Sequence, residues 1–457
     1  MGRIYCMKMN ILARILYLFR TLPIKYPKTE EKSLQRAMDK FIWEGKKARI
    51  SRKLLQKSKY KGGVGVPDLF GYYKAAQFAQ VQAWHMLDGQ PCWVTLEQAL
   101  IQDTKLSEIM WKPTPSAILK HGPPCIAHSL QLWAPYKYRD KLCKPKSLMT
   151  PLLQNPTFLP GTTISDFRWW AQNGITKVGD LLTGSRVKSF NTLKEKYNIP
   201  PREHFRYLQI THWVNTLLRG GCDGSYSKYE SECKKGMKTK GTISRIYYHM
   251  IHETNSNPPK FQEQWSTDLN HPIEEEAWEE VYENISRIST NTLLKENGYK
   301  TIARWYMTPQ KLHKIQNNIP PTCFRGCGEI GTYMHMWWEC PQAKNVWELA
   351  FQEINACYGL TPEPKIALLN LFPIEAFHNE SAKRLIIKIC SATRMVIARH
   401  WKGPIPQAWA AIEAKLGEIM VMETITALIN NKVQKFREIW YPYISRHPIN
   451  TGIDQDP

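Results

Sequence analysis

Three cysteines and a histidine lie within eighteen residues in the C-terminal third of the chain. They are spaced as Cys-x3-Cys-x7-His-x4-Cys and comprise Cys323, Cys327, His335 and Cys340. Thiolate sulfur and imidazole nitrogen are ligands that zinc prefers, and a closed set of four is typical of a structural site, not a catalytic one. The spacing therefore predicts a zinc knuckle. Buried free cysteines in a reducing compartment are the alternative.

The residues around these four positions predict how the chain presents them. Gly326 and Gly328 flank the second cysteine, and glycine takes the positive φ angles that a tight metal-binding loop often requires. Pro341 follows the last cysteine and is favoured at a first helical position, and apolar residues then recur at helical spacing as far as Ile354. Cys340 is therefore expected at a helix N-terminus, where the macrodipole stabilises a thiolate.

The other side chains of the knuckle divide into a packed and an exposed set. We expect Trp337 to pack against the adjacent helix. Phe324 and Arg325 are expected at an exposed loop tip, in reach of a nucleic acid. Because most of the zinc affinity of such a centre is folding energy, losing one ligand in Cys327→Ser is expected to unfold residues 320–345.

The overall charge of the chain indicates a polyanionic partner. Its 457 residues include 62 Lys and Arg against 40 Asp and Glu, a formal net charge of +22. Charge alone does not separate nucleic acid from an anionic membrane surface, but 17 Trp and 21 Tyr add faces on which bases stack, which favours RNA or DNA. No apolar run of about eighteen residues occurs, so no membrane-spanning segment is expected.

Cysteine usage indicates the compartment. The 11 cysteines are odd in number and scattered outside the knuckle, unlike the dense even framework of a small secreted domain. The protein is therefore expected in the cytoplasm and not as a secreted protein, with nuclear entry left open. The sequence also leaves the oligomeric state open.

The most basic stretch of the chain runs from Lys46 to Lys61. It contains eight basic residues and no acid. Helical spacing places positions 46, 49, 53 and 57 on one face, which suits a phosphate backbone because each neutralised phosphate releases condensed counterions. A solvated helix face is the alternative. The nucleic-acid-binding residues expected here are Lys46, Lys47, Arg49, Arg52, Lys53 and Lys57.

Two further basic stretches lie in the middle of the chain. Lys137, Arg139 and Lys141 alternate with tyrosines, which suits a single strand whose bases stack on rings while cations hold its phosphates. Core packing or chance explains this alternation equally well. Residues 228–240 carry lysines among Gly and Ser and are expected to form a basic loop.

Apolar residues recur at helical spacing through most of the chain. The clearest such segments are 7–22, 29–43, 285–306, 381–401 and 406–440. In segment 381–401 the basic residues, Lys388 and Arg394 among them, are expected on the side opposite the apolar stripe. The glycines at 62–65 indicate a turn between helices and not a dinucleotide-binding loop, because no strand precedes them. The predicted fold class is mainly α, a multi-domain helical chain with a small C-terminal zinc knuckle.

Several segments together carry a resemblance to a known family. FIWEGKKARISRKLL (41–55), followed by GGVGVPDLFGYYKAAQFAQVQAWH (62–85), resembles the segment just beyond the polymerase palm in LINE-class non-LTR retrotransposon reverse transcriptases. MNILARILYLFRTLPIKYP (9–27) is similar to that family's thumb entry. CFRGCGEIGTYMHMWWEC, preceded by ARWYMTP (303–309), resembles the C-terminal cysteine-rich domain of the vertebrate type.

The resemblance implies a division of the chain and a partner. It implies a thumb-like helical region over 1–100, a connector or wrist-like region over 101–315, and a C-terminal domain with a CCHC zinc knuckle over 316–457. The family binds its element RNA, so the implied partner is RNA in a retrotransposon RNA particle.

The catalytic parts of that family are expected to be missing. Polymerase chemistry needs carboxylates that hold two metal ions, and the family places a pair of them in an Asp-Asp turn. No Asp-Asp dipeptide occurs in this sequence. Residue 1 already lies in the thumb-like region, so the family's endonuclease is also expected to be absent. The sequence is therefore interpreted as a non-catalytic, RNA-binding fragment of a LINE-type protein.

Three alternatives to this interpretation stay open. The chain could be an accessory part of an RNA-directed DNA polymerase that is completed in trans. It could be a protein–protein adaptor whose knuckle binds helices. It could also be a degraded copy with no selected role. The salt dependence of binding separates the RNA-binding interpretation from the protein–protein adaptor, because contacts to phosphates weaken steeply as the salt concentration rises.

Overall fold

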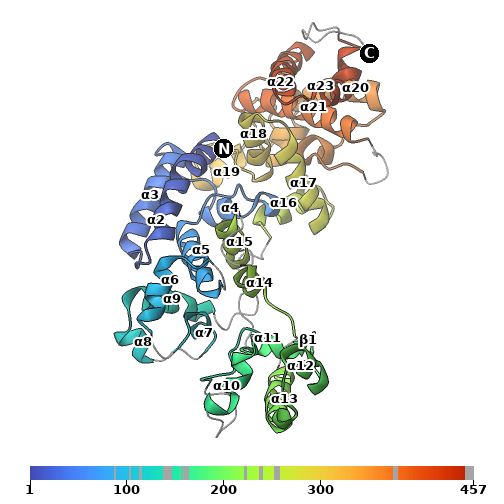
Figure 1. Ribbon diagram of the computed structural model, residues 1–457. Coiled ribbons are helices and arrows are strands. Elements are labelled where there is room, and N and C mark those ends of the chain that lie inside the picture. The colour runs from blue at the N-terminus through green and yellow to red at the C-terminus, as the bar shows by residue number, and fades with distance from the viewer. Residues whose placement is uncertain are drawn as a thin grey trace. The chain divides into compact units, whose positions relative to one another are not determined.

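Helices form most of the chain, as the computed structural model shows (Figure 1). The protein is mainly helical, with 67% of the residues in helices, which confirms the predicted fold class. The structure describes residues 1–86, 89–101, 104–112, 116–136, 147–155, 158, 164–220, 224–235, 240–251, 258–373 and 379–447. No helix in these ranges is both long and apolar enough to cross a membrane.

The chain forms two compact units that are each discontinuous in sequence. Unit 1 comprises Met1–Cys6, Lys40–Val66 and Asn257–Pro457, and unit 2 comprises Met7–Asp39 and Pro67–Ser256. These units cut across the three ranges expected from the family resemblance. That three-part division stays a prediction.

Unit 2 contains short helices and one two-stranded sheet. Its helices are η1 (Met7–Leu12), α2 (Ala13–Thr21), the larger part of α3 (Lys28–Trp43), α5 (Leu69–Val81), η3 (Gln82–His85), α6 (Cys92–Ala99), α7 (Leu106–Ile109), α8 (Ser116–His121), α9 (Pro124–Trp133), η4 (Ala134–Tyr136), α10 (Ile164–Gln172), α11 (Val178–Leu181), α12 (Phe190–Tyr197), η5 (Pro201–Glu203), α13 (His204–Arg219), α14 (Lys228–Lys235) and α15 (Thr242–Ile251). The antiparallel strands β1 (Leu182–Thr183) and β2 (Arg186–Val187) pair Leu182 with Val187 and Thr183 with Arg186.

Unit 1 contains the knuckle and the longest helices. Its elements are α1 (Gly2–Cys6), the end of α3, α4 (Arg52–Gln56), η2 (Lys59–Lys61), α16 (Lys260–Asp268), α17 (Glu275–Arg287), α18 (Thr292–Ile302), α19 (Pro309–Ile315), η6 (His335–Glu339), α20 (Pro341–Tyr358), η7 (Lys365–Leu369), α21 (Glu380–Arg399), α22 (Trp409–Ile429) and α23 (Val433–Ile444).

The core of unit 2 is centred on α5, which is apolar on nearly all sides. Residues 69–81 include nine buried positions, and α5 packs against α2, α9 and α15. The ring of Tyr72 stacks on Tyr247 of α15 with a centroid distance of 3.7 Å. A helix that is apolar all round is stable only when other elements cover it, and α5 meets that condition.

The core of unit 1 is centred on α21, the helix predicted over 381–401. Asn379 caps its start, because the Asn379 side chain accepts hydrogen bonds from the backbone N–H groups of Ser381 and Ala382. Helices α20, α22 and α23 pack around α21. Its apolar stripe is buried, as predicted.

The expected position of two basic residues on α21 is wrong. Lys388 is 4% exposed and Arg394 is fully buried. Lys388 Nζ donates to Glu423 Oε1 at 2.6 Å and to the carbonyl of Ile288 at 3.1 Å. Burial lowers the pKa of Lys388, and it lowers the pKa of Arg394 to about 10. The reason is that helices cover α21 on several sides, so the face opposite the apolar stripe is also interior.

Three other segments differ from the sequence expectation. The segment 406–440 is not one helix. The helix is interrupted between α22 and α23, where Asn431 has a φ of +53°. The segment 285–306 contains the end of α17 and all of α18 instead of one helix. In the expected basic loop 228–240, Lys228–Lys235 form the helix α14, and residues 236–239 lie outside the described residues.

Candidate metal centre

The structure brings the four predicted zinc ligands together. The three sulfur atoms and the imidazole nitrogen all lie within 4.8 Å of one another. Cys323 Sγ is 3.9 Å from Cys340 Sγ, and Cys327 Sγ is 3.2 Å from His335 Nε2. Four donors bonded tetrahedrally at zinc distances lie about 3.3–3.8 Å apart. The group therefore has the donor set and the size for a metal ion such as zinc.

No other such group occurs in the part of the chain that the structure describes. Cys323, Cys327, His335 and Cys340 are the one set of three or more His, Cys, Asp or Glu side chains placed there to hold a metal ion. Two of the cysteines and the histidine are buried and Cys327 is half-buried. Donors shielded from water in this way suit a structural metal site.

A short loop presents Cys323 and Cys327. Thr322 and Ile330 form an antiparallel bridge, and the N–H of Cys323 donates to the carbonyl of Glu329 at 2.8 Å. Between them the chain turns sharply, and Gly326 and Gly328 have φ angles of +77° and +84°. These angles confirm the predicted need for glycine on both sides of the second cysteine.

A wide helical turn presents His335 and Cys340. Residues His335–Glu339 form the π-helix η6, and the N–H of Cys340 donates to the carbonyl of His335 at 2.9 Å, five residues back. This wider turn brings residues five apart close together. The N–H of His335 is itself fixed by Thr332 Oγ1 at 3.0 Å. This turn was not predicted from the sequence, although the x4 spacing of the last two ligands is its signal.

The start of helix α20 helps to lower the pKa of the Cys340 thiol. Cys340 is the residue that precedes the first turn of α20, as predicted. Burial raises its pKa, but the Arg325 guanidinium and the backbone N–H groups of Ala343 and Gln342 outweigh burial, and the net pKa of the thiol is lowered. The helix start therefore favours the thiolate that a metal ion requires.

The pKa of the Cys323 thiol is shifted in the opposite direction. Burial, with the nearby sulfurs of Cys327 and Cys340, raises the pKa of its thiol to about 12. A thiol with this pKa is ionised near neutral pH only if a cation lies beside it, because a bound metal ion inverts the local preference for the neutral form. The four donors are therefore complementary to a divalent cation.

The expected exposure of Arg325 is wrong. Its side chain is only 8% exposed, Nη1 donates to the carbonyl of Met336 at 2.7 Å, and the guanidinium lies 5.9 Å from the centroid of the Trp401 ring. Phe324 is half-buried, so it is less exposed than expected. The loop tip folds back onto η6 instead of facing solvent. Arg325 thus ties the loop to η6. Its predicted contact with a nucleic acid stays a prediction.

The predicted packing of Trp337 is confirmed. Its side chain has no exposed area, and its ring lies 5.2 Å from Tyr306 and 5.1 Å from Trp401 by centroid distance. The adjacent helix α20 also contacts it, because Trp347 Nε1 donates to the Trp337 carbonyl at 2.8 Å. The hydroxyl of Tyr333 donates to the Thr301 carbonyl at 2.8 Å. The knuckle therefore packs against residues 301–306, α20 and Trp401.

The basic segment 46–57 is not one helix. Helix α3 ends at Trp43, and Glu44 and Gly45 follow with positive φ angles of 55° and 73°. Helix α4 begins only at Arg52, where Ser51 Oγ accepts from the N–H of Leu54 at 3.3 Å. The predicted shared face of positions 46, 49, 53 and 57 is therefore wrong, because the cap at Ser51 restarts the helix and Lys46, Lys47 and Arg49 precede it.

The basic residues of this segment differ in exposure. Lys46, Lys47, Arg49 and Lys53 are exposed, whereas Arg52 and Lys57 are half-buried. Burial and the charge of Lys61 lower the pKa of Lys57. The Arg49 guanidinium lies over the Trp305 ring, 4.5 Å from its centroid. Lys46 Nζ lies 3.4 Å from the exposed carboxylate of Glu44.

The glycines at 62–65 form the turn that the sequence predicted. The N–H groups of Val64 and Val66 both donate to the carbonyl of Leu55, at 3.2 and 2.8 Å. A Cβ atom on Gly63 would lie 2.1 Å from the carbonyl oxygen of Lys57. Glycine is therefore required at position 63 by the close approach of the backbone and not by a phosphate.

The second predicted patch cannot be placed. Lys137, Arg139 and Lys141 lie outside the described residues. Tyr136, just before them, is buried, and its hydroxyl accepts from Lys74 Nζ at 2.9 Å. At least this one of the interleaved tyrosines is therefore packed in the protein.

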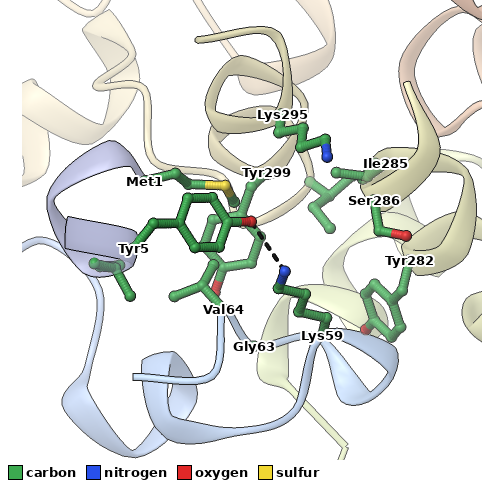
Figure 2. A pocket seen from close by; sticks show the side chains of 12 residues that line it. Met1, Tyr5, Lys59, Gly63, Val64, Tyr282, Ile285, Ser286, Lys295 and Tyr299 are labelled. Carbon is green, nitrogen blue, oxygen red and sulfur yellow. Dashed lines mark hydrogen bonds between the residues drawn. The ribbon is translucent and has the colours of Figure 1, made fainter. Parts of the chain in front are cut away.

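Figure 2 shows a small pocket in unit 1, lined by residues from α1, the segment 59–64, α17 and α18. Lys59 Nζ donates to the hydroxyl of Tyr5 at 2.9 Å across one side of it. Its volume of about 30 Å³ is enough for about one or two water molecules. It is too small to bind a substrate, so we regard it as a packing feature.

No protein-family model matches the sequence.

Proposed function

We propose that the chain is a non-catalytic, RNA-binding protein derived from a LINE-type retrotransposon reverse transcriptase. The observation that carries the proposal is a four-donor metal centre in the same compact unit as an exposed basic segment. The segment resemblances at 9–27, 41–85 and 303–340 support the family. The net charge of +22 supports a polyanionic partner.

Zinc would be held by Cys323, Cys327, His335 and Cys340. Bound there, it would supply a structural cross-link, because four protein donors leave no coordination position for a substrate or a water molecule. The Arg325 guanidinium and the start of α20 would hold the Cys340 thiolate in place. The role of the centre is then to keep the loop and η6 rigid.

The basic segment would supply the contacts to phosphate. Lys46, Lys47, Arg49 and Lys53 are exposed, and each can displace a condensed counterion from a nucleic acid. Arg49 lies over Trp305, and Tyr306, the next residue, packs against Trp337 of the knuckle. The segment and the knuckle are thus connected through side-chain contacts in unit 1.

Sequence supports the absence of polymerase chemistry. The two metal ions of a polymerase site need neighbouring carboxylates, and no Asp-Asp dipeptide is available in the chain. The function proposed is therefore binding without turnover of the nucleic acid.

Binding of the full-length chain to labelled single-stranded RNA at salt concentrations from 50 to 200 mM tests this proposal. We expect log K to fall linearly with log salt concentration, with a slope set by the number of phosphates contacted. Lys46→Ala/Lys47→Ala should reduce the slope by about 1.4, which is two contacts of about 0.7 each for a single strand. Lys432→Ala/Lys435→Ala removes two exposed lysines elsewhere in unit 1 and should leave the slope unchanged.

Two outcomes would contradict the proposal. One is binding to RNA that does not depend on salt, which is the behaviour of an apolar adaptor surface. The other is nucleotide incorporation by the isolated chain on a primed RNA template.

A further inference from the structure

A lysine-lined cleft in unit 2 was not anticipated from the sequence. It has a volume of about 790 Å³ and lies where η3, α6, α7, α11 and α14 meet. Figure 1 shows α7, α11 and α14 coming together in this part of unit 2. A cleft of this volume is in the range that binds small organic ligands, about 300–1,000 Å³. It is large enough for about one or two nucleotides and too small for a duplex.

Four lysines from three elements line this cleft. Lys105 precedes α7, Lys177 precedes α11, and Lys234 and Lys235 end α14. Lys105 and Lys177 form no ion pair with any carboxylate that the structure describes. Lys234 Nζ lies over the Tyr226 ring at 4.1 Å. These side chains come from positions about 130 residues apart in sequence, yet they face one space.

The acidic residues that the structure describes near the cleft do not neutralise its four lysines. Among the residues that the structure describes, Glu108 is the only acidic one that lines the cleft, and Glu108 Oε2 accepts from Lys112 Nζ at 3.0 Å. Lys235 Nζ is 3.4 Å from Glu232, but the same carboxylate is held by Arg245 at 3.0 Å. The described lining of the cleft therefore carries a net positive charge, which suits an anionic ligand.

Buried apolar side chains also line the cleft. Trp84, Val94, Leu106 and Met149 line it and are each at most 5% exposed. A groove lined by cations and by apolar side chains has the two features that bind single-stranded nucleic acid, because phosphates are held by cations while bases pack on flat or apolar surfaces.

We propose that this cleft binds the phosphates of a nucleic-acid single strand through Lys105, Lys177, Lys234 and Lys235. This inference rests on the proposed function and adds a contact in unit 2 that is separate from the basic segment and the knuckle. The bound part of the strand is about one or two nucleotides long, because the volume of the cleft limits it.

Salt titration of the full-length chain with an oligouridylate tests the proposal. The variant Lys105→Ala/Lys177→Ala/Lys234→Ala/Lys235→Ala removes all four lysine charges that line the cleft. At about 0.7 per phosphate contact, the slope of log K against log salt concentration should decrease by about 3. The control Lys120→Ala/Lys194→Ala/Lys196→Ala/Lys228→Ala removes four exposed lysines of unit 2 that do not line the cleft, and its slope should equal that of the unmodified chain.

Lysine acetylation footprinting of the unmodified chain gives an independent readout if the fourfold variant fails to fold. Oligouridylate should protect Lys105, Lys177 and Lys234 from acetylation at least threefold, and Lys194 should be unaffected. Uridine triphosphate, used as a second probe, distinguishes a strand from a free nucleotide. Protection by the triphosphate but not by the oligonucleotide would overturn the proposal in favour of a nucleotide site.

The two proposals fail in different ways. If the unmodified chain shows no salt-dependent RNA binding, the proposed function is wrong. If it binds RNA but the cleft variant keeps the slope of the control and no cleft lysine is protected, the basic cleft is only a solvated surface and the inference is wrong while the proposed function stands.

Discussion

Replacing Cys327 by serine tests the metal centre with little change in packing. Cys327 is half-buried, and its Sγ lies 3.2 Å from His335 Nε2. Serine is nearly the same size and keeps a polar atom at this position, but an alkoxide or hydroxyl is a poor zinc ligand. The substitution therefore removes one of four donors without creating a large cavity.

The expected effect is large because little else holds the loop. Metal binding to a structural zinc site is worth about 10–16 kcal/mol in apparent free energy, most of it spent on folding. Ordering the backbone costs roughly 1–2 kcal/mol per residue. The bonds that tie the loop, such as Cys323 N–H to Glu329 and Arg325 to Met336, contribute about 1 kcal/mol each. These bonds cannot offset the entropy of the loop between Cys323 and Ile330 without the metal, whereas Tyr333 and Trp337 are also held by packing.

Zinc content and limited proteolysis read out this effect. The unmodified chain should hold one zinc ion, measured by atomic emission, and resist cleavage between 320 and 345. Cys327→Ser should hold none and be cut there. A strong chelator should give the unmodified chain the same cleavage pattern. Cys357→Ser changes a half-buried cysteine in α20 outside the cluster, and it should behave as the unmodified chain does.

The reasoning would be refuted by a zinc-free chain that remains protected. If Cys327→Ser resists protease over 320–345 as well as the unmodified chain does, or if it retains stoichiometric zinc, the centre is not what holds the loop.

Two predictions concern stability in the two units. Arg394→Ala should lower the free energy of unfolding of unit 1 by about 3–5 kcal/mol, because the guanidinium is fully buried and donates to three oxygens at 2.8–3.0 Å. Arg399→Ala, an exposed residue on the same helix, should change it by less than about 0.5 kcal/mol in urea unfolding. Burial lowers the pKa of His85 from 6.5 to about 4, so its contribution to stability is present above pH 6.5 and is lost as the pH falls to 4, on the order of 2–3 kcal/mol in total. His85→Gln should remove this part of the acid sensitivity when urea unfolding is compared at pH 7 and pH 4.5, and an equal loss in both proteins would show that His85 is not its source.

Sequence was sufficient where local spacing determines the structure. The ligands at 323–340 could be recognised because zinc fixes their chemical types and their close spacing. Helices α3 and α21 could be predicted because apolar residues recur at helical spacing. Gly326 and Gly328 could be assigned positive φ angles for the same kind of local reason.

The sequence was insufficient where the exposure of a residue depends on contacts with distant parts of the chain. Whether Arg325 faces solvent depends on the loop folding back onto η6, and whether Arg394 is exposed depends on helices that lie elsewhere in the chain. The basic segment 46–57 has a helical charge pattern, but the cap at Ser51 overrides it. The cleft of unit 2 could not be found from sequence, because its lysines are adjacent only after folding.

The contacts that the knuckle makes with residues upstream of it limit how the chain can be divided. Residues 316–457 look like a self-contained C-terminal module, but Thr301 and Tyr306 lie upstream of that boundary and hold Tyr333 and Trp337. A protein cut at 316 would expose these aromatic rings to water and would lose unit 1 residues 40–66 as well. Proteolysis near residue 316 would therefore be expected to inactivate the knuckle instead of releasing it as a working piece.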